Sequence, residues 1–214
     1  DVLTRDRFAT RANIIDSAAA LISAHGMAHL GINALADAAK CDKVLIYRYF
    51  GGLDGVIEAL AAERLLWPRV ELTDEESAGD ASLADAVLTL VLAEWAALSA
   101  GALMLQASSA ELSSAGPLGA STSMQRREAH ARLVTTLKSQ HRVPPYIDLP
   151  AILEILSAAV TAFALRANLG SVASGSDAKT IVGATFDPST PQGWRRIEKT
   201  LAAMTKALLD ASAP

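Results

Sequence analysis

The sequence predicts an all-α protein in which an N-terminal three-helix helix-turn-helix domain precedes a C-terminal helical bundle. The first observation is composition: of 214 residues, 51% are hydrophobic but only 5% are aromatic. The apolar residues are mainly alanine and leucine, which favour helices, and runs typical of strands are scarce. The second observation is that apolar residues recur at three- and four-residue spacings, the period of an amphipathic helix. All-β architectures are therefore excluded.

Four helices are expected in the N-terminal part, at residues 10–25, 32–39, 43–50 and 54–67. Gly26 follows the first of them, as glycine commonly does just past a helix end. Asp42 suits the N-cap of the third, because its carboxylate can accept hydrogen bonds from exposed backbone N–H groups. Pro68 ends the fourth, since proline cannot continue a helix.

The C-terminal part is expected to contribute five helices, at residues 82–99, 102–113, 117–141, 149–169 and 191–211. The acidic, polar stretch 71–82 is typical of a linker. The stretch 170–193 is rich in glycine, serine and threonine and predicts a long loop, in which 180–186 is a candidate for a short extended piece.

One apolar run, Ala86–Ala107, is long enough to be a membrane span but contains Glu94. A carboxylate near the centre of a bilayer helix costs about 2.5–3.5 kcal/mol, which favours a buried central helix over the membrane alternative. The single cysteine, Cys41, excludes an internal disulfide and a thiolate zinc site. Because no apolar segment follows basic residues at the N-terminus, we expect a cytoplasmic protein.

Two C-terminal helices carry apolar residues at an average spacing of 3.5, which is typical of helices packed side by side. Such a seam fits packing inside one subunit or pairing with the same helices of a second subunit. We expect the second arrangement, a homodimer interface formed by Leu153, Leu156, Val160, Phe163, Trp194, Ile197, Leu201, Met204 and Leu208.

The helices at 32–39 and 43–50, joined by a short turn, have the arrangement of a helix-turn-helix. In this motif the second helix enters the major groove of DNA with its N-terminal residues leading. Its cations can neutralise phosphates or donate to guanine, its tyrosines can bond phosphate oxygens, and its aliphatic side chains can touch a thymine methyl. The expected contacts on this helix are Lys43, Val44, Leu45, Tyr47, Arg48 and Tyr49.

Two of these residues have other interpretations: Tyr47 can be a core residue and Arg48 a solvated surface group. Phe50 is expected in the core. The charge distribution agrees with a DNA-facing N-terminus, because residues 1–50 hold six basic and five acidic groups while the rest hold 13 and 18.

Three features occur in order along the N-terminal part: Gly26 after the first helix, Leu35-Ala36-Asp37-Ala38-Ala39 in the second, and Tyr47-Arg48-Tyr49-Phe50 ending the third. This combination, within Thr10 to Val56, resembles the DNA-binding domain of the TetR family of bacterial transcription regulators.

The resemblance implies a helix-turn-helix DNA-binding domain at 1–55 and a helical ligand-binding and dimerisation domain at 56–214. It implies a homodimer that binds a palindromic double-stranded operator, and a small-molecule effector that releases it. Arg11, Asn33 and Lys40 join the expected DNA contacts, and operator affinity is expected to depend more than is typical on Arg5, Arg7, Arg11 and Lys40.

Three positions depart from the family pattern. Lys40 stands where the family has glycine at the turn, and a non-glycine residue in a left-handed conformation costs about 1 kcal/mol. Leu53 replaces a phosphate-contacting lysine, and Gly31 replaces the serine or threonine that caps the second helix.

The effector is expected in an apolar pocket with a few polar groups. The candidate lining residues are Glu94, Trp95, Leu98, Met104, Met124 and Phe163. Each can instead be plain core, and Glu94 can be a capping or surface residue. His25, His29, His130 and His141 lack metal-ligand spacing and are expected at the surface or at caps, so no metal or cofactor is expected.

Two rival functions remain open at this point. A helical enzyme is disfavoured because no nucleophile set, phosphate loop, metal cluster or pair of acids at helical spacing is present in the sequence. The other rival is an interaction module that retains the helix-turn-helix but does not bind DNA, given Leu53, Lys40 and the nearly neutral N-terminal part.

Overall fold

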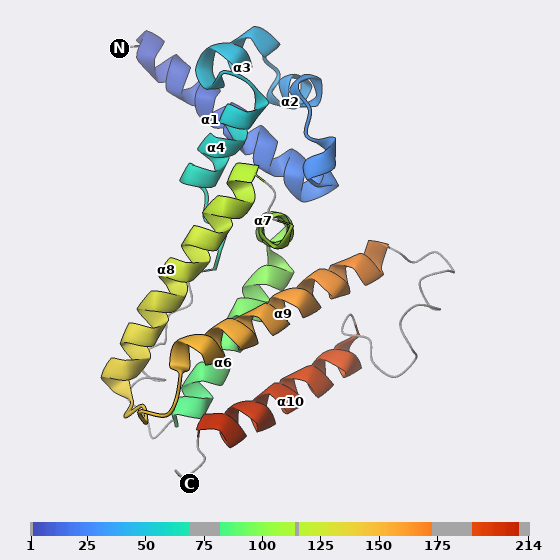
Figure 1. Ribbon diagram of the computed structural model, residues 1–214. Helices are drawn as coiled ribbons and strands as arrows, with labels where there is room; N and C mark the ends of the chain where they lie inside the picture. Colours follow the sequence, from blue (N-terminus) through green and yellow to red (C-terminus); the bar gives the residue numbers. More distant parts are fainter. Residues whose placement is uncertain (1, 69–81, 114–115, 173–189, 210–214) are drawn as a thin grey trace. The chain divides into compact units, whose positions relative to one another are not determined.

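The computed structural model describes residues 2–68, 82–113, 116–172 and 190–209 (Figure 1). These residues form helices without a strand, so the all-α prediction is confirmed. In chain order the elements are α1 (Val2–His25), η1 (Met27–His29), α2 (Ile32–Ala39), α3 (Lys43–Phe50), α4 (Leu53–Glu63), α6 (Leu83–Ala100), α7 (Ala102–Leu112), α8 (Gly116–Gln140), α9 (Leu149–Val172) and α10 (Pro191–Leu209).

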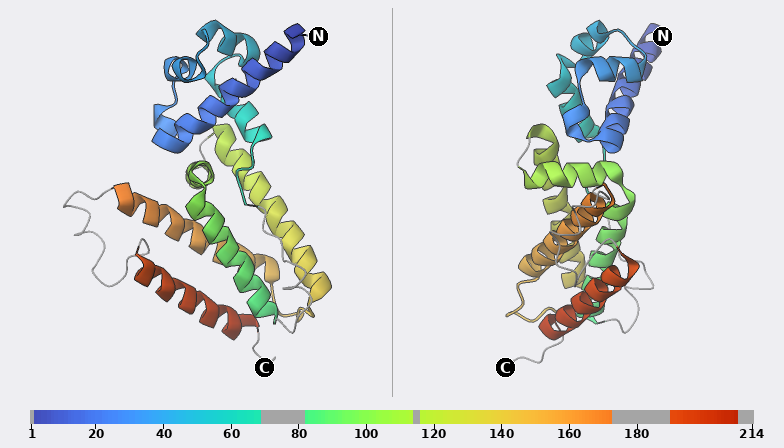
Figure 2. Two further views of the ribbon diagram at one scale, coloured as in Figure 1. Left: turned by 180° about the vertical axis from the view of Figure 1, so that it is seen from behind. Right: turned by 90° about the vertical axis from the view of Figure 1, so that its right-hand side faces the viewer.

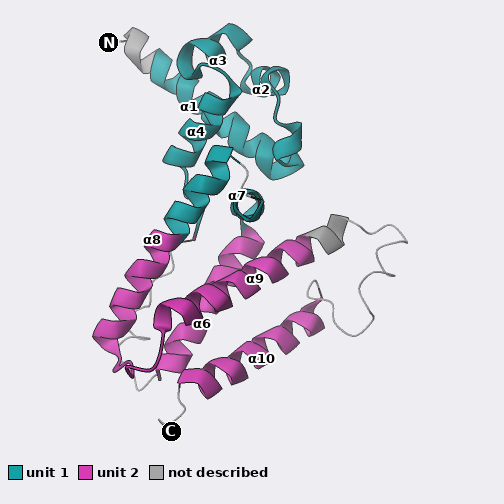
Figure 3. Cartoon of the chain, in the orientation of Figure 1, with its two compact units in different colours: residues 1–67, 101–126 teal, residues 68–100, 127–214 magenta. Residues whose placement is uncertain are grey.

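The chain divides into two compact units (Figure 3). Unit 1 consists of residues 1–67 and 101–126, and unit 2 of residues 68–100 and 127–214, so α8 contributes its first part to one unit and its second part to the other. The predicted functional boundary after residue 55 stays a prediction. The compact units differ from it because α4 and α7 both pack on α1.

The core of unit 1 is built on one face of α1. Ile14, Ile15 and Ile22 are completely or almost completely buried there, and they pack with Leu35 of α2 and Ile46 of α3. These positions follow the 3.6-residue period, which places them on one side of the helix. The small helices of the helix-turn-helix are therefore held by apolar contacts to α1.

The core of unit 2 is built around α6, on which both α9 and α10 pack (Figures 1 and 2). Val87, Leu90 and Val91 of α6 are buried in this core. A polar contact also joins α6 to α10, since Lys206 Nζ lies 3.2 Å from Asp85 Oδ1. The Ser82 hydroxyl, with a smaller contribution from Lys206, lowers the pKa of Asp85.

Most of the residues predicted to form a dimer interface pack inside the subunit. Five of its residues are buried in the core of unit 2, and their side chains are therefore unavailable to a partner; they are Leu153, Leu156, Val160, Ile197 and Leu201. Phe163 and Trp194 are half-buried against the same core. Only Met204 and Leu208 are exposed, to 50% and 48%. The 3.5-residue spacing is the same for both kinds of packing, so the dimer interface stays a prediction.

Several helix boundaries differ from prediction. Helix α1 begins eight residues before the expected start. Residues 2–9 contain no glycine or proline that would end a helix, and adding residues to a helix that has already formed costs little. Helix α4 ends at Glu63 instead of residue 67, and α9 continues through Gly170 to Val172. The predicted linker, apart from Ser82, and the candidate extended piece at 180–186 lie outside the described residues.

The apolar run 86–107 is not one helix, because α6 ends at Ala100 and α7 begins at Ala102 after Gly101. By length and composition alone, Leu83–Ala100 and Leu149–Asn168 could each cross a membrane. In unit 2, however, these helices pack on each other, and Glu94 of α6 is buried and paired with His130 of α8. This is the arrangement of core helices, as the sequence predicted for this run.

Candidate nucleic-acid interface

The turn between α2 and α3 is closed by backbone hydrogen bonds. Lys40 has φ 51 and ψ 45, in the left-handed region, and the Cys41 N–H donates to the Ala36 carbonyl at 3.0 Å. Asn13 of α1 reinforces the turn, since its Nδ2 donates to the Ala39 carbonyl at 2.7 Å. Burial, with a smaller contribution from Asp42, raises the pKa of the Cys41 thiol. The turn thus has a fixed geometry although it lacks the family's glycine.

Helix α3 begins at the predicted residue and with the predicted cap. The Asp42 carboxylate accepts a hydrogen bond from the Val44 N–H at 2.8 Å. Ile46 is completely buried and fixes the inner face of α3 on the core of unit 1. At the other end, Gly51 adopts φ 76 and its N–H donates to the Tyr47 carbonyl. Both ends of this short helix are therefore capped.

The outer face of α3 carries most of the residues predicted to contact DNA. Val44 and Tyr47 are 63% and 54% exposed, which contradicts a core position for Tyr47. Lys43 and Arg48 are also exposed, whereas Leu45 and Tyr49 are half-buried. Phe50 packs against the core as expected. The predicted contacts on the neighbouring helix and turn, Asn33 and Lys40, are exposed as well.

The cations on this surface differ in their partners. Arg11 of α1 pairs with Glu63 at 2.6 Å and lies 5.3 Å from the Phe50 ring centroid. Within the described ranges, Lys43 and Arg48 make no ion pair with a carboxylate. The one acidic group next to Lys43 in sequence, Asp42, is used as the helix cap. The exposed face of α3 therefore presents positive charge that carboxylates do not neutralise.

The three departures from the family pattern have visible consequences. Lys40 adopts the left-handed conformation. Gly31 gives α2 no side-chain cap hydrogen bond. Leu53, which replaces the phosphate-contacting lysine, packs against the core of unit 1. At positions 31 and 53 the side chain offers no donor, so a phosphate contact there would require backbone N–H groups or neighbouring cations.

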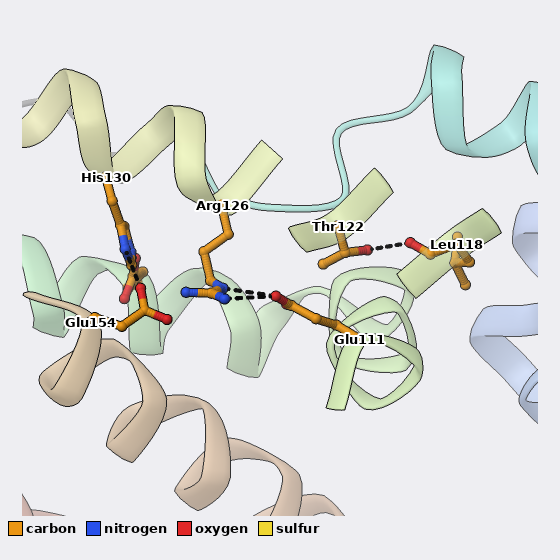
Figure 4. Close-up of polar contacts among 7 residues, drawn as sticks. Glu111, Leu118, Thr122, Arg126, His130 and Glu154 are labelled. Atoms are coloured by element: carbon orange, nitrogen blue, oxygen red, sulfur yellow. Dashed lines mark hydrogen bonds and ion pairs between the residues drawn. The ribbon is translucent and has the colours of Figure 1, made fainter. Parts of the chain in front are cut away.

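In unit 2, a buried polar cluster forms around the predicted ligand residue Glu94. The cluster joins three helices: His130 Nε2 lies 3.1 Å from Glu94 Oε1, and His130 Nδ1 lies 3.1 Å from Glu154 Oε2. The Glu94 and His130 side chains are 5% and 9% exposed, while that of Glu154 is 50% exposed. Figure 4 shows His130 of α8 directed at Glu154 of α9.

This cluster corrects two predictions. His130 was expected at the surface or at a cap, and Glu94 had the same alternative, but both are buried and face each other. Neither residue has a sequence neighbour that signals the other, since 36 positions separate them. The one available signal was the carboxylate on an otherwise apolar helix, which requires a partner when buried.

The other predicted ligand residues do not come together in one unit. Trp95 stacks on Trp194 of α10, with ring centroids 3.6 Å apart, and Leu98 is completely buried. These two and Phe163 belong to unit 2, but Met104 and Met124 belong to unit 1, where Met124 is 52% exposed. The ligand-binding set therefore stays a prediction, and its support is confined to unit 2.

A second ion pair that the sequence did not reveal lies in unit 1. Arg126 of α8 donates to Glu111 of α7 through Nε at 2.9 Å and Nη2 at 2.8 Å, and its guanidinium lies 5.8 Å from the Trp67 ring centroid (Figure 4). In the same part of α8, the Thr122 hydroxyl donates to the Leu118 carbonyl. The Arg126–Glu111 pair joins α8 to α7, whereas the Thr122 bond lies within α8.

Comparison with known proteins decides the identity of the N-terminal helices. Residues 14–60 match the family model of the bacterial regulatory proteins of the tetR family. This part of the chain is therefore similar to the N-terminal domain of tetR-family regulators. No curated protein sequence matches the chain significantly.

Two solved structures have a fold similar to that of this chain. The fatty acid degradation regulator FadR from Bacillus halodurans is 15% identical, with a TM-score of 0.60 over 92% of this chain and 94% of that one. A HlyIIR mutant protein with a GSSGSSG linker is 11% identical, with a TM-score of 0.56 over 97% and 98%. At these identities the likeness concerns the fold alone. The match of residues 14–60 to the family model supports a DNA-binding transcriptional regulator.

Proposed function

We propose that this regulator is a cytoplasmic repressor that binds a palindromic operator as a homodimer and leaves it when a small-molecule effector binds. The observation that carries the proposal is the outer face of α3, where Lys43 and Arg48 are exposed without a carboxylate partner in the described parts of the chain. Such a surface suits a polyanion, and a helix of this size fits the major groove. No catalytic role is proposed.

In this mechanism α3 is the recognition helix. Lys43 and Arg48 would neutralise phosphates or donate to guanine, and Val44 would touch a thymine methyl. Tyr47 is exposed and free to bond a phosphate oxygen. Asn33, Lys40 and Arg11 would contact the backbone around the groove, Arg11 with its charge partly balanced by Glu63.

The dimer would use the apolar residues that unit 2 leaves exposed on its last two helices. These are Met204 and Leu208 on α10, together with Ile155 on α9, which is 66% exposed. A two-fold axis would place the two recognition helices about 34–36 Å apart, or a multiple of this, to reach successive major grooves.

The effector would bind in unit 2 near Glu94 and His130, where a buried charge already exists on helices that otherwise bury apolar side chains. An effector that binds better to one separation of the recognition helices shifts the population away from the DNA-binding arrangement. Glu94, Trp95, Leu98 and Phe163 are the residues we would test first for this role.

The test is binding to a duplex that carries the sequence upstream of the protein's own gene. Lys43→Ala and Arg48→Ala should each weaken binding, and Lys138→Ala, an exposed lysine of α8, is the charge-matched control. Wild-type affinity should fall steeply with salt, with a slope of about −0.9 for each neutralised phosphate. Absence of binding at low salt would favour the interaction module, and unchanged affinity in both α3 variants would exclude α3 as the recognition helix.

The dimer is tested separately by sedimentation. Leu208→Glu should convert a dimer into monomers because it places a charge in an apolar interface, whereas Ile152→Val in the core should leave the mass unchanged. A wild-type monomer at all concentrations would contradict the proposed dimer.

A further inference from the structure

The aromatic ring of Tyr49, on α3, is contacted by two arginines from different helices. The guanidinium of Arg7, in α1, lies 5.6 Å from the ring centroid of Tyr49, and that of Arg48 lies 5.0 Å from it. Arg48 also donates from Nη2 to the Tyr49 hydroxyl oxygen at 3.0 Å. Both arginines are exposed, whereas Tyr49 is half-buried and packs against the core of unit 1.

Arg7 and Arg48 differ from two other arginines of unit 1, which are paired with carboxylates. Arg11 pairs with Glu63, and Arg64 pairs with Asp16. In the part of the chain that the structure describes, no carboxylate pairs with Arg7 or Arg48. A ring face attracts a cation by about 0.5–1 kcal/mol at an exposed site, which does not neutralise two like charges. This arrangement is suited to an anion.

We propose that Arg7 and Arg48 together bind the phosphate backbone of duplex DNA, and that Tyr49 is the positioning residue that holds both guanidinium groups. The inference rests on the proposed function and extends the DNA contact on α1 from Arg11 to Arg7. A guanidinium matches a phosphate through two parallel N–H donors. Because the Tyr49 ring is fixed by the core, the two arginines are ordered before DNA arrives, which lowers the entropy cost of binding.

The experiment measures affinity for a mixed-sequence duplex over a range of salt concentrations, because a phosphate contact does not depend on sequence. Arg7→Gln should weaken binding to this duplex and to an operator-like duplex by the same factor, and should reduce the salt slope by about 1. The matched control is Arg64→Gln, which removes the same charge from a residue already paired with Asp16 and should leave the slope unchanged.

Tyr49 is tested with two substitutions. Tyr49→Leu leaves both arginines but removes the ring, and should weaken DNA binding, whereas Tyr49→Phe keeps the ring and should restore most of the affinity. Substituting Arg7→Gln in the Tyr49→Leu background should then cost less than it does in the wild type, since the ring no longer orders the arginine. Urea unfolding of each free variant checks the fold, and Arg7→Gln should unfold at the wild-type midpoint or above.

The outcomes separate the two claims. If the wild-type protein binds no duplex even at low salt, the proposed function is wrong and this inference falls with it. If the wild type binds but Arg7→Gln keeps the affinity and slope of Arg64→Gln, the Arg7–Tyr49–Arg48 arrangement has no part in DNA binding, while α3 can still be the recognition helix. A slope reduced in Arg7→Gln but not in Arg64→Gln supports the inference.

Discussion

The exposed face of α3 in unit 1 and the polar cluster of unit 2 differ in whether their charged side chains are exposed and whether they are paired. On unit 1, Lys43 and Arg48 are exposed and have no carboxylate partner among the described residues. In unit 2, Glu94 is buried and faces His130, which also contacts Glu154. Exposed charge without a partner costs the fold little and is available to a ligand, whereas buried charge must be satisfied inside the protein.

The difference implies different consequences of mutation. Substitutions on the recognition surface should change DNA binding and leave unfolding nearly unaffected. Substitutions in the cluster should change unfolding first, because a buried group that loses its partner retains the cost of its removal from water. The predictions below test this contrast, beginning with the largest expected effect.

The strongest test compares the two carboxylates that contact His130. Glu94→Ala should lower the free energy of unfolding by about 3–5 kcal/mol, the cost of breaking a buried pair by removing one partner. Glu154 is half-exposed, so Glu154→Ala should cost no more than about 1 kcal/mol. Urea unfolding measures both. Equal losses would contradict the distinction, as would a loss at Arg48→Ala as large as that at Glu94→Ala.

A second test concerns the close packing of α4 against the end of α3, which we expect to position α3. A Cβ at Gly55 of α4 would overlap the Phe50 carbonyl oxygen, which is backbone and cannot move aside as a side chain could. Gly55→Ala should therefore destabilise the protein by about 1–3 kcal/mol through overpacking.

The matched control for this change is Gly31→Ala. A Cβ at Gly31 meets nothing within 4 Å, and its φ of −127 suits any residue. Its unfolding midpoint should stay close to that of the wild type. A Gly55→Ala variant as stable as Gly31→Ala would show that the connection between α3 and α4 is looser than the structure indicates.

A third test concerns the one carboxylate next to the recognition helix. Asp42→Ala removes the N-cap of α3 and should cost about 1 kcal/mol in unfolding free energy. Asp42→Asn keeps a cap but removes the charge, so stability should be nearly retained while DNA affinity rises at low salt. If Asn were as destabilising as Ala, the carboxylate would have a role beyond capping.

The sequence was sufficient where the signals are local. The bounds of α2 and α3 and the Asp42 cap follow from residues close together in the chain, and the structure agrees with them. For Tyr47 the sequence left a DNA-contacting and a core position open, and its 54% exposure decides against the core.

What the sequence could not supply depends on tertiary packing. The pairing of Glu94 with His130 joins helices far apart in the chain, and no local pattern encodes it. The spacing of Leu153, Leu156 and Val160 fits a seam within a subunit as well as one between subunits. Arg7 lies before the apolar period of α1 begins, so its proximity to Tyr49 appeared only with the longer helix.

The smallest expected effect isolates the backbone at the turn. Lys40→Gly and Lys40→Ala remove the same charge, so both should weaken DNA binding equally if Lys40 contacts a phosphate. They differ in the left-handed conformation, which glycine adopts without strain. After allowance for the greater freedom of glycine in the unfolded chain, Lys40→Gly should be more stable than Lys40→Ala by about 0.5–1 kcal/mol. Equal stability would mean that the turn relaxes away from the left-handed region when the lysine is replaced, and the positions of α2 and α3 would then depend on their buried side chains alone.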